Sequence, residues 1–489
     1  MSVPPADTTS VLDVVIVGAG IIGCMTAREL VAAFPGAAVA VVDRDQVGSG
    51  ASRRSAGLHF PRGSSARVRG MAALSERRYR ELREELPGLP VHDVPTTVVA
   101  AESSAGRLAE HYLPSAGLDP VRRVPAGPAG MVRLPAGSGA WSVRGGQYAD
   151  VHGVAQLLAA RLRPGVRFFE GARVVAIESC PDRVRLRLST GEVLAARTVV
   201  LAPGPWIEDP AWRRWTAPLG LRVKKVVALH VEQRPRPADG VIVFEDEDAF
   251  LLPLHHRGHW LFSYTCAQWD VSPEGTHSHL STVEIAEGRA VLERFAPGLV
   301  RHCGTGRVFC DAYSAERAPV VRPVDEHGRV IFAGAANGSG YRLAPAIAAE
   351  TVRAVGTVDV WTTGGATGAA RAVRTVEAAE TAESGAVAEA VRAVEVVEAA
   401  ESGVVAEAVR AVEVVEAAES GVVAEAVRAV EVVEAARAVR TAETAHAAGT
   451  AEAAEPAAAA GTARPAEPLR ASRPTHPATP APDLPRSAQ

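Results

Sequence analysis

Cysteine is scarce in this chain of 489 residues, which contains five cysteines and no CxxC pair. Disulfide frameworks use an even set of cysteines, and structural zinc sites use closely spaced pairs. We therefore expect neither a disulfide-stapled fold nor a metal site. Lysine is scarcer still, since all but two of the 52 basic residues are arginine. That bias is typical of a GC-rich genome and is not evidence for phosphate binding.

The chain also lacks long hydrophobic runs and a strong charge of either sign. No run of 18 apolar residues occurs, so no membrane-spanning helix is expected. Residues 1–10 lack the charged and apolar segments of a signal peptide, so the expected location is the cytoplasm. The formal net charge of −4 does not indicate nucleic acid or an anionic membrane as the main partner.

The chain consists of an enzyme-like first part and a repetitive second part. Up to about residue 357, apolar strand-like runs alternate with turns and amphipathic segments, which is typical of an α/β enzyme. A chain of this length exceeds one compact core, so at least two folding regions are expected. After residue 357, the sequence consists almost entirely of Ala, Val, Glu, Arg and Thr.

The second part contains an internal repeat of 18 residues. The sequence ESGVVAEAVRAVEVVEAA occupies residues 401–418 and 419–436, and residues 383–400 differ from it at one position. Each unit would make about five helical turns, but a glutamate and a glycine interrupt its apolar stripe. Two interpretations stay open for 358–454: a marginal, solvated helix that arose by duplication, or an arm that binds an unknown partner. Residues 455–489 are rich in Pro and Ala, and we expect them to be disordered.

The strongest functional signal follows the first expected strand. Residues 12–17 (LDVVIV) form a short apolar run typical of a buried parallel strand, and GAGIIG follows at 18–23, before a helical stretch at 24–34. The first glycine of this motif permits a tight turn, the second lets the backbone approach a pyrophosphate, and the third lets the helix pack close to the sheet. The helix N-terminus offers free N–H groups to phosphates.

An acidic residue ends the next expected strand. Asp43 follows the strand at 38–42 and lies 20 residues beyond Gly23, where its carboxylate can accept both ribose hydroxyls of an adenosine. The same carboxylate disfavours NADP, because it would repel a 2′-phosphate. The strand, the glycines, the helix and the acid together predict a dinucleotide site, but they do not separate FAD from NAD.

Two further segments rich in small residues favour FAD. VGSGASRRSAGLHF occupies residues 47–60, and RVIFAGAANGSGYRLAPAIA occupies residues 329–348. In the second segment, a strand leads into three glycines and then a helix, whose N-terminal dipole would stabilise negative charge on reduced flavin. An NAD dehydrogenase has no need of a second glycine-rich turn so far along the chain.

Together with VVLAPGPW at residues 199–206, these segments resemble the D-amino-acid oxidase, glycine oxidase and sarcosine oxidase family of FAD-dependent enzymes. The resemblance covers about residues 12–356, and its first and last motifs are the specific ones. The Ala-Pro-Gly of the middle motif departs from the family's commoner Ala-Gly pair, so the local turn is left open.

The resemblance implies a fold and a division of the chain. The implied fold is α/β, with a Rossmann-like FAD-binding domain, an inserted mixed-sheet substrate domain and a low-complexity C-terminal tail. The expected parts are a disordered N-terminus at 1–11, the first part of the FAD-binding domain with some substrate-domain excursions at 12–206, mainly substrate domain at 207–328, the closing strand and helix of the FAD-binding domain at 329–357, and the tail at 358–454 and 455–489.

FAD is the implied cofactor, and the resemblance also implies the residues that contact it. They are Gly18, Gly20, Ile21, Ile22, Gly23, Asp43, Arg44, Ser52, Ser55, Gly57, Val174, Gly204, Trp206, Gly338, Ser339, Gly340, Tyr341 and Arg342. Some relatives attach flavin through the Cys of a CxYT motif, whereas Cys310 is followed by Asp-Ala-Tyr-Ser, which contains one extra residue. Non-covalent FAD is therefore expected.

The implied activity is oxidation of a C–N bond in an amino acid or secondary amine by hydride transfer to flavin, with reoxidation by oxygen and release of peroxide. Arg342 matches a basic position that binds the substrate carboxylate in sarcosine-oxidase-like relatives; a surface or helix-capping arginine is the alternative. Tyr313, Tyr264, His255 and His256 are candidates for the substrate pocket, although a His pair near a hairpin tip is more often a solvated turn. Lys224 or Lys225 is either close to the flavin, where its charge would help oxygen accept an electron, or at the surface.

Two other functions stay open. An FAD-dependent 2-hydroxy-acid dehydrogenase would share the scaffold, and peroxide release with an amine substrate would separate the two activities. In a different class of protein, the repetitive arm recruits a partner and the flavin domain is only structural. Turnover by a chain that ends near residue 357 would argue against that class.

Overall fold

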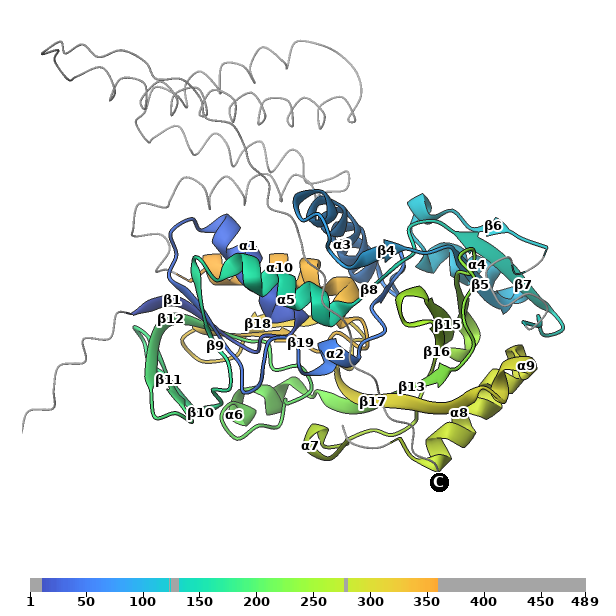
Figure 1. Ribbon diagram of the computed structural model, residues 1–489. Helices are drawn as coiled ribbons and strands as arrows, with labels where there is room; N and C mark the ends of the chain where they lie inside the picture. The colour runs from blue at the N-terminus through green and yellow to red at the C-terminus, as the bar shows by residue number, and fades with distance from the viewer. Residues whose placement is uncertain (1–10, 123, 125–131, 277–279, 359–489) are drawn as a thin grey trace, which may run out of the picture. The chain divides into compact units, whose positions relative to one another are not determined.

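A computed structural model describes residues 11–122, 124, 132–276 and 280–358 (Figure 1). All of them lie in the first of two compact units, Met1–Ala390. The predictions about the repeats and the Pro-rich end fall outside the described residues. None of the described helices is both long and apolar enough to cross a membrane.

The first sheet is parallel at its centre. Its five parallel strands are, in spatial order, β9 (Val166–Phe169), β2 (Val39–Val42), β1 (Leu12–Val17), β12 (Val193–Leu201) and β19 (Val330–Gly334). Most residues of these strands are buried on both sides of the sheet, which is why they read as continuous apolar runs instead of alternating ones. Because the strands are parallel, the segments that follow β1, β2, β12 and β19 meet at one edge.

Antiparallel strands extend this sheet. β10 (Val174–Ser179) and β11 (Val184–Leu188) form a hairpin whose second strand pairs with the N-terminal half of β12. β18 (Val320–Pro323) pairs antiparallel with β19. In β11, buried and exposed residues alternate, as expected of a strand with one solvated face.

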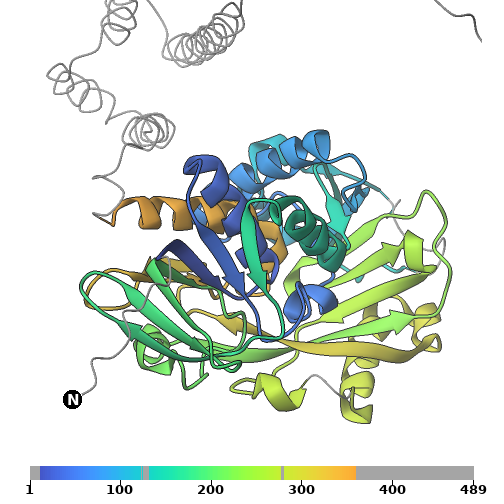
Figure 2. The same ribbon diagram turned by 60° about the vertical axis from the view of Figure 1, so that its left-hand side comes forward.

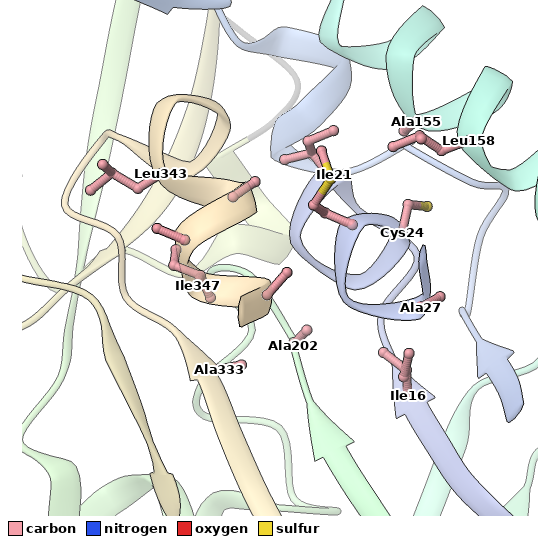
Figure 3. Close-up of a cluster of buried hydrophobic side chains, with 14 of the residues drawn as sticks. Ile16, Ile21, Cys24, Ala27, Ala155, Leu158, Ala202, Ala333, Leu343 and Ile347 are labelled. Atoms are coloured by element: carbon pink, nitrogen blue, oxygen red, sulfur yellow. The ribbon is translucent and has the colours of Figure 1, made fainter. Parts of the chain in front are cut away.

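Three helices cover one face of the first sheet: α1 (Ile21–Ala33), α5 (Val151–Leu162) and α10 (Gly340–Gly356) (Figures 1 and 2). Figure 3 shows the core between them, in which side chains of α1 lie between those of α10 and α5, above the strands. The labelled residues are Ile21, Cys24 and Ala27 of α1, Leu343 and Ile347 of α10, Ala155 and Leu158 of α5, and Ile16, Ala202 and Ala333 at the sheet. Each fully buried Leu or Ile contributes about 1.5–3 kcal/mol relative to exposure.

The second sheet is mixed. Its order is β17 (Cys303–Tyr313), β13 (Arg222–Val231), β16 (His259–Tyr264), β15 (Ala249–Leu254), β14 (Val241–Phe244), β5 (Thr96–Ala101), β7 (Ser138–Val143) and β6 (Asp119–Pro120). Only the β14–β5 pair is parallel among the described strands of this sheet. Helix α8 (Thr282–Phe295), which begins with a capping box of Ser281 and Glu284, and α9 (Pro297–Val300) pack against it.

A third sheet and further helices complete the described part of the chain. A short antiparallel sheet has the order β3 (Leu58–His59), β8 (Gln147–Ala149) and β4 (Val91–Asp93). The remaining helices are α2 (Ala51–Arg54), α3 (Ala66–Glu85), α4 (Ala105–His111), α6 (Arg213–Thr216) and α7 (Pro273–Thr276). The α/β architecture with a Rossmann-like sheet and a mixed sheet confirms the predicted fold class.

The domain boundaries proposed from the sequence stay a prediction. β5, β6 and β7 precede residue 206 but belong to the second sheet, and β18 precedes residue 329 but belongs to the first. Helix α1 begins at Ile21, three residues before the helical stretch at 24–34 that the sequence indicated. Its first turn is closed by a backbone hydrogen bond from Cys24 N–H to the carbonyl of Gly20, and the low helix propensity of glycine hides this start in the sequence.

Candidate functional site

A cavity of about 320 Å³ lies at the edge where the parallel strands of the first sheet end. Except for Gly23, His255 and His256, every residue predicted from the sequence to contact cofactor or substrate lines it. The lining residues are Gly18, Gly20, Ile21 and Ile22 after β1; Asp43 and Arg44 after β2; Ser52, Ser55 and Gly57 around α2; Val174 on β10; Gly204 and Trp206 after β12; Gly338, Ser339, Gly340, Tyr341 and Arg342 after β19; and Lys224, Tyr264 and Tyr313 on the second sheet.

The turn between β1 and α1 requires glycine for two separate reasons. Gly18 has a φ of +108°, and a Cβ there would lie 2.2 Å from the carbonyl oxygen of Ala202. Gly23 lies beneath the turn, where a Cβ would be 1.9 Å from the carbonyl oxygen of Gly18. The absence of both side chains therefore lets strand, turn and helix pack in contact.

The N-terminus of α1 presents backbone donors to the cavity. The N-cap residue of α1 is Gly20, which has no side chain to cap the helix. The N–H of Ile21 donates to Ser52 Oγ over 3.0 Å. The N–H of Ile22 has no acceptor within the described part of the chain. Uncapped donors at the positive end of a helix dipole suit an anion such as a pyrophosphate.

Asp43 is oriented by two backbone donors at the end of β2. One of its carboxylate oxygens accepts from Ala19 N over 2.6 Å, and the other accepts from Asp45 N over 2.8 Å. Burial raises the pKa of Asp43, although these two hydrogen bonds oppose the shift. Each oxygen keeps a further lone pair, so the cavity-lining carboxylate can accept ribose hydroxyls.

An aromatic wall lies beside Asp43. The guanidinium carbon of Arg44 is 4.1 Å from the ring centre of Trp206, and Arg44 also forms ion pairs with Asp45 and Glu274. Val174 is buried at the same part of the cavity. This flat, partly apolar wall suits the adenine of a dinucleotide.

The second glycine-rich turn joins β19 to α10 through left-handed backbone. Ala335 and Asn337 each have a φ of +53°, and Gly338 has a φ of +76°, although non-glycine residues there cost about 1–2 kcal/mol each. Asn337 Nδ2 donates to the carbonyl of Ala335 over 2.8 Å, and its Oδ1 accepts from Ser314 N over 3.1 Å. The turn delivers the uncapped N-terminus of α10 to the cavity.

Arg342 is a cation without a matching anion. Its Nη2 donates to Ser339 Oγ over 2.7 Å, and its guanidinium carbon lies 5.1 Å from the ring centre of Phe60. No carboxylate of the described residues forms an ion pair with it, whereas the neighbouring Arg62 pairs with the 2 %-exposed Glu245 side chain over 2.6 Å. Burial, with a smaller contribution from Arg62, lowers the pKa of Arg342 to about 10, so it stays charged at neutral pH.

The two adjacent lysines have different surroundings. Lys225 forms an ion pair with the buried carboxylate of Glu284. Lys224 lines the cavity, with its Nζ 5.2 Å from the ring centre of Trp269 and 5.5 Å from that of Tyr313. Lys225 also lines the cavity, but its ammonium is engaged by Glu284, so the hypothesis that a lysine assists oxygen is kept as a prediction for Lys224.

The sequence analysis did not single out Asp311 or Glu245, which also line the cavity. Asp311 is the one carboxylate in the otherwise apolar run Val308–Tyr313, and that isolation is a signal the sequence did offer. Glu245 follows directly after β14, but its pairing with Arg62 is not visible in the sequence. Across the described ranges, no group of three His, Cys, Asp or Glu side chains could hold a metal ion.

Comparison with known proteins identifies a family. The family model for FAD-dependent oxidoreductases of the DAO type matches residues 13–354. No curated protein matches the chain.

Solved structures share the fold at low sequence identity. Glycine oxidase from Geobacillus kaustophilus is 21 % identical, with a TM-score of 0.59 over 71 % of this chain and 95 % of its own. L-proline dehydrogenase from P. horikoshii is 15 % identical, with a TM-score of 0.61 over 75 % and 99 %. L-α-glycerophosphate oxidase from Mycoplasma pneumoniae, solved with FAD bound, is 16 % identical, with a TM-score of 0.57 over 71 % and 95 %.

Proposed function

The chain belongs to the DAO family of FAD-dependent oxidoreductases, and on that premise we propose that it oxidises a C–N bond in an amino acid or a secondary amine. Oxygen then accepts the electrons, and hydrogen peroxide is released. The observation that carries the proposal is Arg342, a cavity-lining guanidinium with no carboxylate partner among the described residues. A substrate carboxylate would supply the missing anion through two parallel hydrogen bonds.

The residues of the cavity fit FAD. The first glycine turn leaves a backbone cradle that a Cβ at Gly18 would destroy, and Ile22 offers an unused N–H for the diphosphate. Asp43 would hold the adenosine ribose, and Val174 would contact the adenine. The N-terminus of α10 would face the flavin pyrimidine, where its dipole favours negative charge. Bound FAD supplies the two-electron acceptor of the reaction.

The attachment of FAD is proposed to be non-covalent. Cys310 and Ala312 belong to the hydrophobic core beneath the first sheet, whereas Asp311 and Tyr313 line the cavity. This alternation along β17 is the ordinary alternation of a strand. It directs the Cys310 thiol away from the cavity.

The protein's own share of the reaction is to bind and orient the substrate. Arg342 would hold the carboxylate, while Phe60 and Tyr313 form apolar walls that exclude water. Lys224 would place a positive charge where oxygen is reduced. The names of glycine oxidase and L-proline dehydrogenase support an amino-acid substrate, whereas the glycerophosphate oxidase shows that the scaffold also serves other substrates.

The proposal is tested by cofactor release and by turnover in air. Acid precipitation of the purified protein should release a yellow cofactor that chromatography identifies as FAD. Glycine, sarcosine and both enantiomers of alanine and proline would then be offered, with peroxide as the readout. Peroxide formation with lactate but with none of these amines would replace the proposal by a 2-hydroxy-acid oxidoreductase.

A further inference from the structure

We propose that Asp311 is the catalytic base that accepts a proton from the ammonium group of the substrate. This inference rests on the amine oxidation proposed above and assigns a residue to a step that oxidation requires. Asp311 lies on β17, and it lines the cavity together with Tyr313, two residues along the same strand, and Lys224, which is directly opposite it on β13.

The carboxylate of Asp311 is unpaired. No described residue donates a hydrogen bond to it or forms an ion pair with it. Structural carboxylates that are partly buried are normally hydrogen-bonded or paired, because desolvation without a partner is costly. By contrast, Glu245 and Glu284 are each paired with a basic side chain. Asp311 is therefore available to a ligand in the cavity.

The surroundings of Asp311 set its proton affinity. Burial raises the pKa of Asp311 to about 7, so near neutral pH it can accept and release a proton with little driving force in either direction. On the second-sheet side, the charged and titratable groups that line the cavity with Asp311 are Lys224 and Lys225 on β13, Tyr264 on β16, Cys266 after β16, Tyr313 on β17 and Asp248 before β15. Of these, Lys225 is paired with Glu284. The ammonium of Lys224 lies over the rings of Trp269 and Tyr313, and burial keeps Tyr313 neutral by raising its pKa.

Amine oxidation needs such a group. An amino acid in neutral water carries an ammonium, whose nitrogen has no lone pair with which to form a C=N bond. The Asp311 carboxylate would take one proton and leave the electron pair on nitrogen. FAD, when bound, would supply the acceptor for the hydride of the Cα–H bond, and the nitrogen lone pair would form the C=N bond as that bond breaks. The balance would be an iminium ion, two-electron-reduced FAD and one proton, which would leave Asp311 for solvent.

The test compares Asp311→Asn with Asp270→Asn, an isosteric change at an exposed carboxylate. The readout is the pH dependence of anaerobic FAD reduction by the best amine of the panel, measured per bound flavin. In the parent and the control, the second-order rate constant for FAD reduction should rise with a pKa near 7 and then stay level, because the neutral amine that forms at higher pH needs no base. In D311N it should be about 100-fold to 10,000-fold lower at pH 7.

The shape of the D311N profile separates a base from a structural residue. Without a base, only the neutral amine reacts, so the rate constant for FAD reduction should climb tenfold per pH unit up to the pKa of the substrate amine and level off there, with no rise centred near pH 7. Asp311→Glu should restore a rise of the rate constant with a pKa near neutral pH. A D311N profile that keeps the parent's rise near pH 7, whether at the same height or uniformly lowered, overturns the proposal.

A second measurement does not depend on the substrate. An infrared difference titration of the holoenzyme should show a protonated carboxyl that ionises near pH 7 in the parent and is missing in D311N. If no amine of the panel reduces the parent while this band is present, the proposed function fails and the ionisation of Asp311 stands. If the band is absent, the proposal for Asp311 fails whatever the substrate.

Discussion

Arg342 illustrates how one side chain can indicate a ligand. Its guanidinium is held by Ser339 and lies over Phe60, and among the described residues no carboxylate forms an ion pair with it, although Glu245 and Asp248 act on it from a greater distance. Glu245 neutralises the neighbouring Arg62. Arg342 therefore provides a basic group of the cavity that remains available for an anionic substrate.

Replacing Arg342 by Ala should lower kcat/KM by roughly 30-fold to 1,000-fold, since a charge-assisted pair in a partly buried site contributes on the order of 2–4 kcal/mol. FAD content should stay near that of the parent, because the phosphates are bound elsewhere. Lys at this position should retain more activity than Ala, as it keeps the charge. Arg183→Ala, at an exposed ion pair, is the control. Unchanged turnover by R342A would move the carboxylate site to Arg62 or elsewhere.

The burial of Asp311 should also make the free energy of unfolding depend on pH. Burial raises its pKa to about 7, so between its ordinary pKa and about 7 the folded state binds more protons than the unfolded state. This contribution to the free energy of unfolding is fully present below the ordinary pKa and is lost as pH rises through about 7. Asp311→Asn should therefore flatten the fall in Tm between about pH 4 and pH 7. An identical pH dependence in parent and variant would contradict the assigned burial effect.

At the scale of elements, the turn between β1 and α1 is where backbone geometry creates the site. Gly18→Ala combines an unfavourable φ with a collision against the backbone of Ala202. Gly36→Ala is a matched control, because Gly36 has a φ of +87° and nothing within 4 Å of an added Cβ. G36A should cost only about 1–2 kcal/mol, whereas G18A should also lower FAD content. Equal losses in both variants would show that close packing at Gly18 is unimportant.

The sequence predicted individual strands and turns better than it predicted which strands and side chains pair with one another. The strand Leu12–Val17 and the turn after it were predictable, because apolar runs and glycines act over a few residues. The proximity of Asp311 to Lys224 depends on the register between β13 and β17, which nothing local specifies. The pairing of Arg62 with Glu245 likewise joins segments that are far apart in the chain.

At the scale of the whole molecule, the elements of both sheets and the residues that line the cavity all belong to the stretch from Val11 to Val358. A chain that ends at residue 358 should therefore keep its FAD content, its Tm and its turnover. The measurement is a side-by-side comparison of full-length and shortened protein. Loss of flavin or stability on shortening would show that the repetitive segment contributes to folding or assembly.

The central claim is that this cavity brings an amine to bound FAD. The most direct test is the visible spectrum of the purified protein during anaerobic addition of an amine from the panel, with lactate and glycerol 3-phosphate as comparison compounds. We predict that the absorbance of oxidised flavin bleaches with at least one amine, stays unchanged with both hydroxy compounds, and returns on admission of air with formation of peroxide. Bleaching by a hydroxy compound alone would contradict the account.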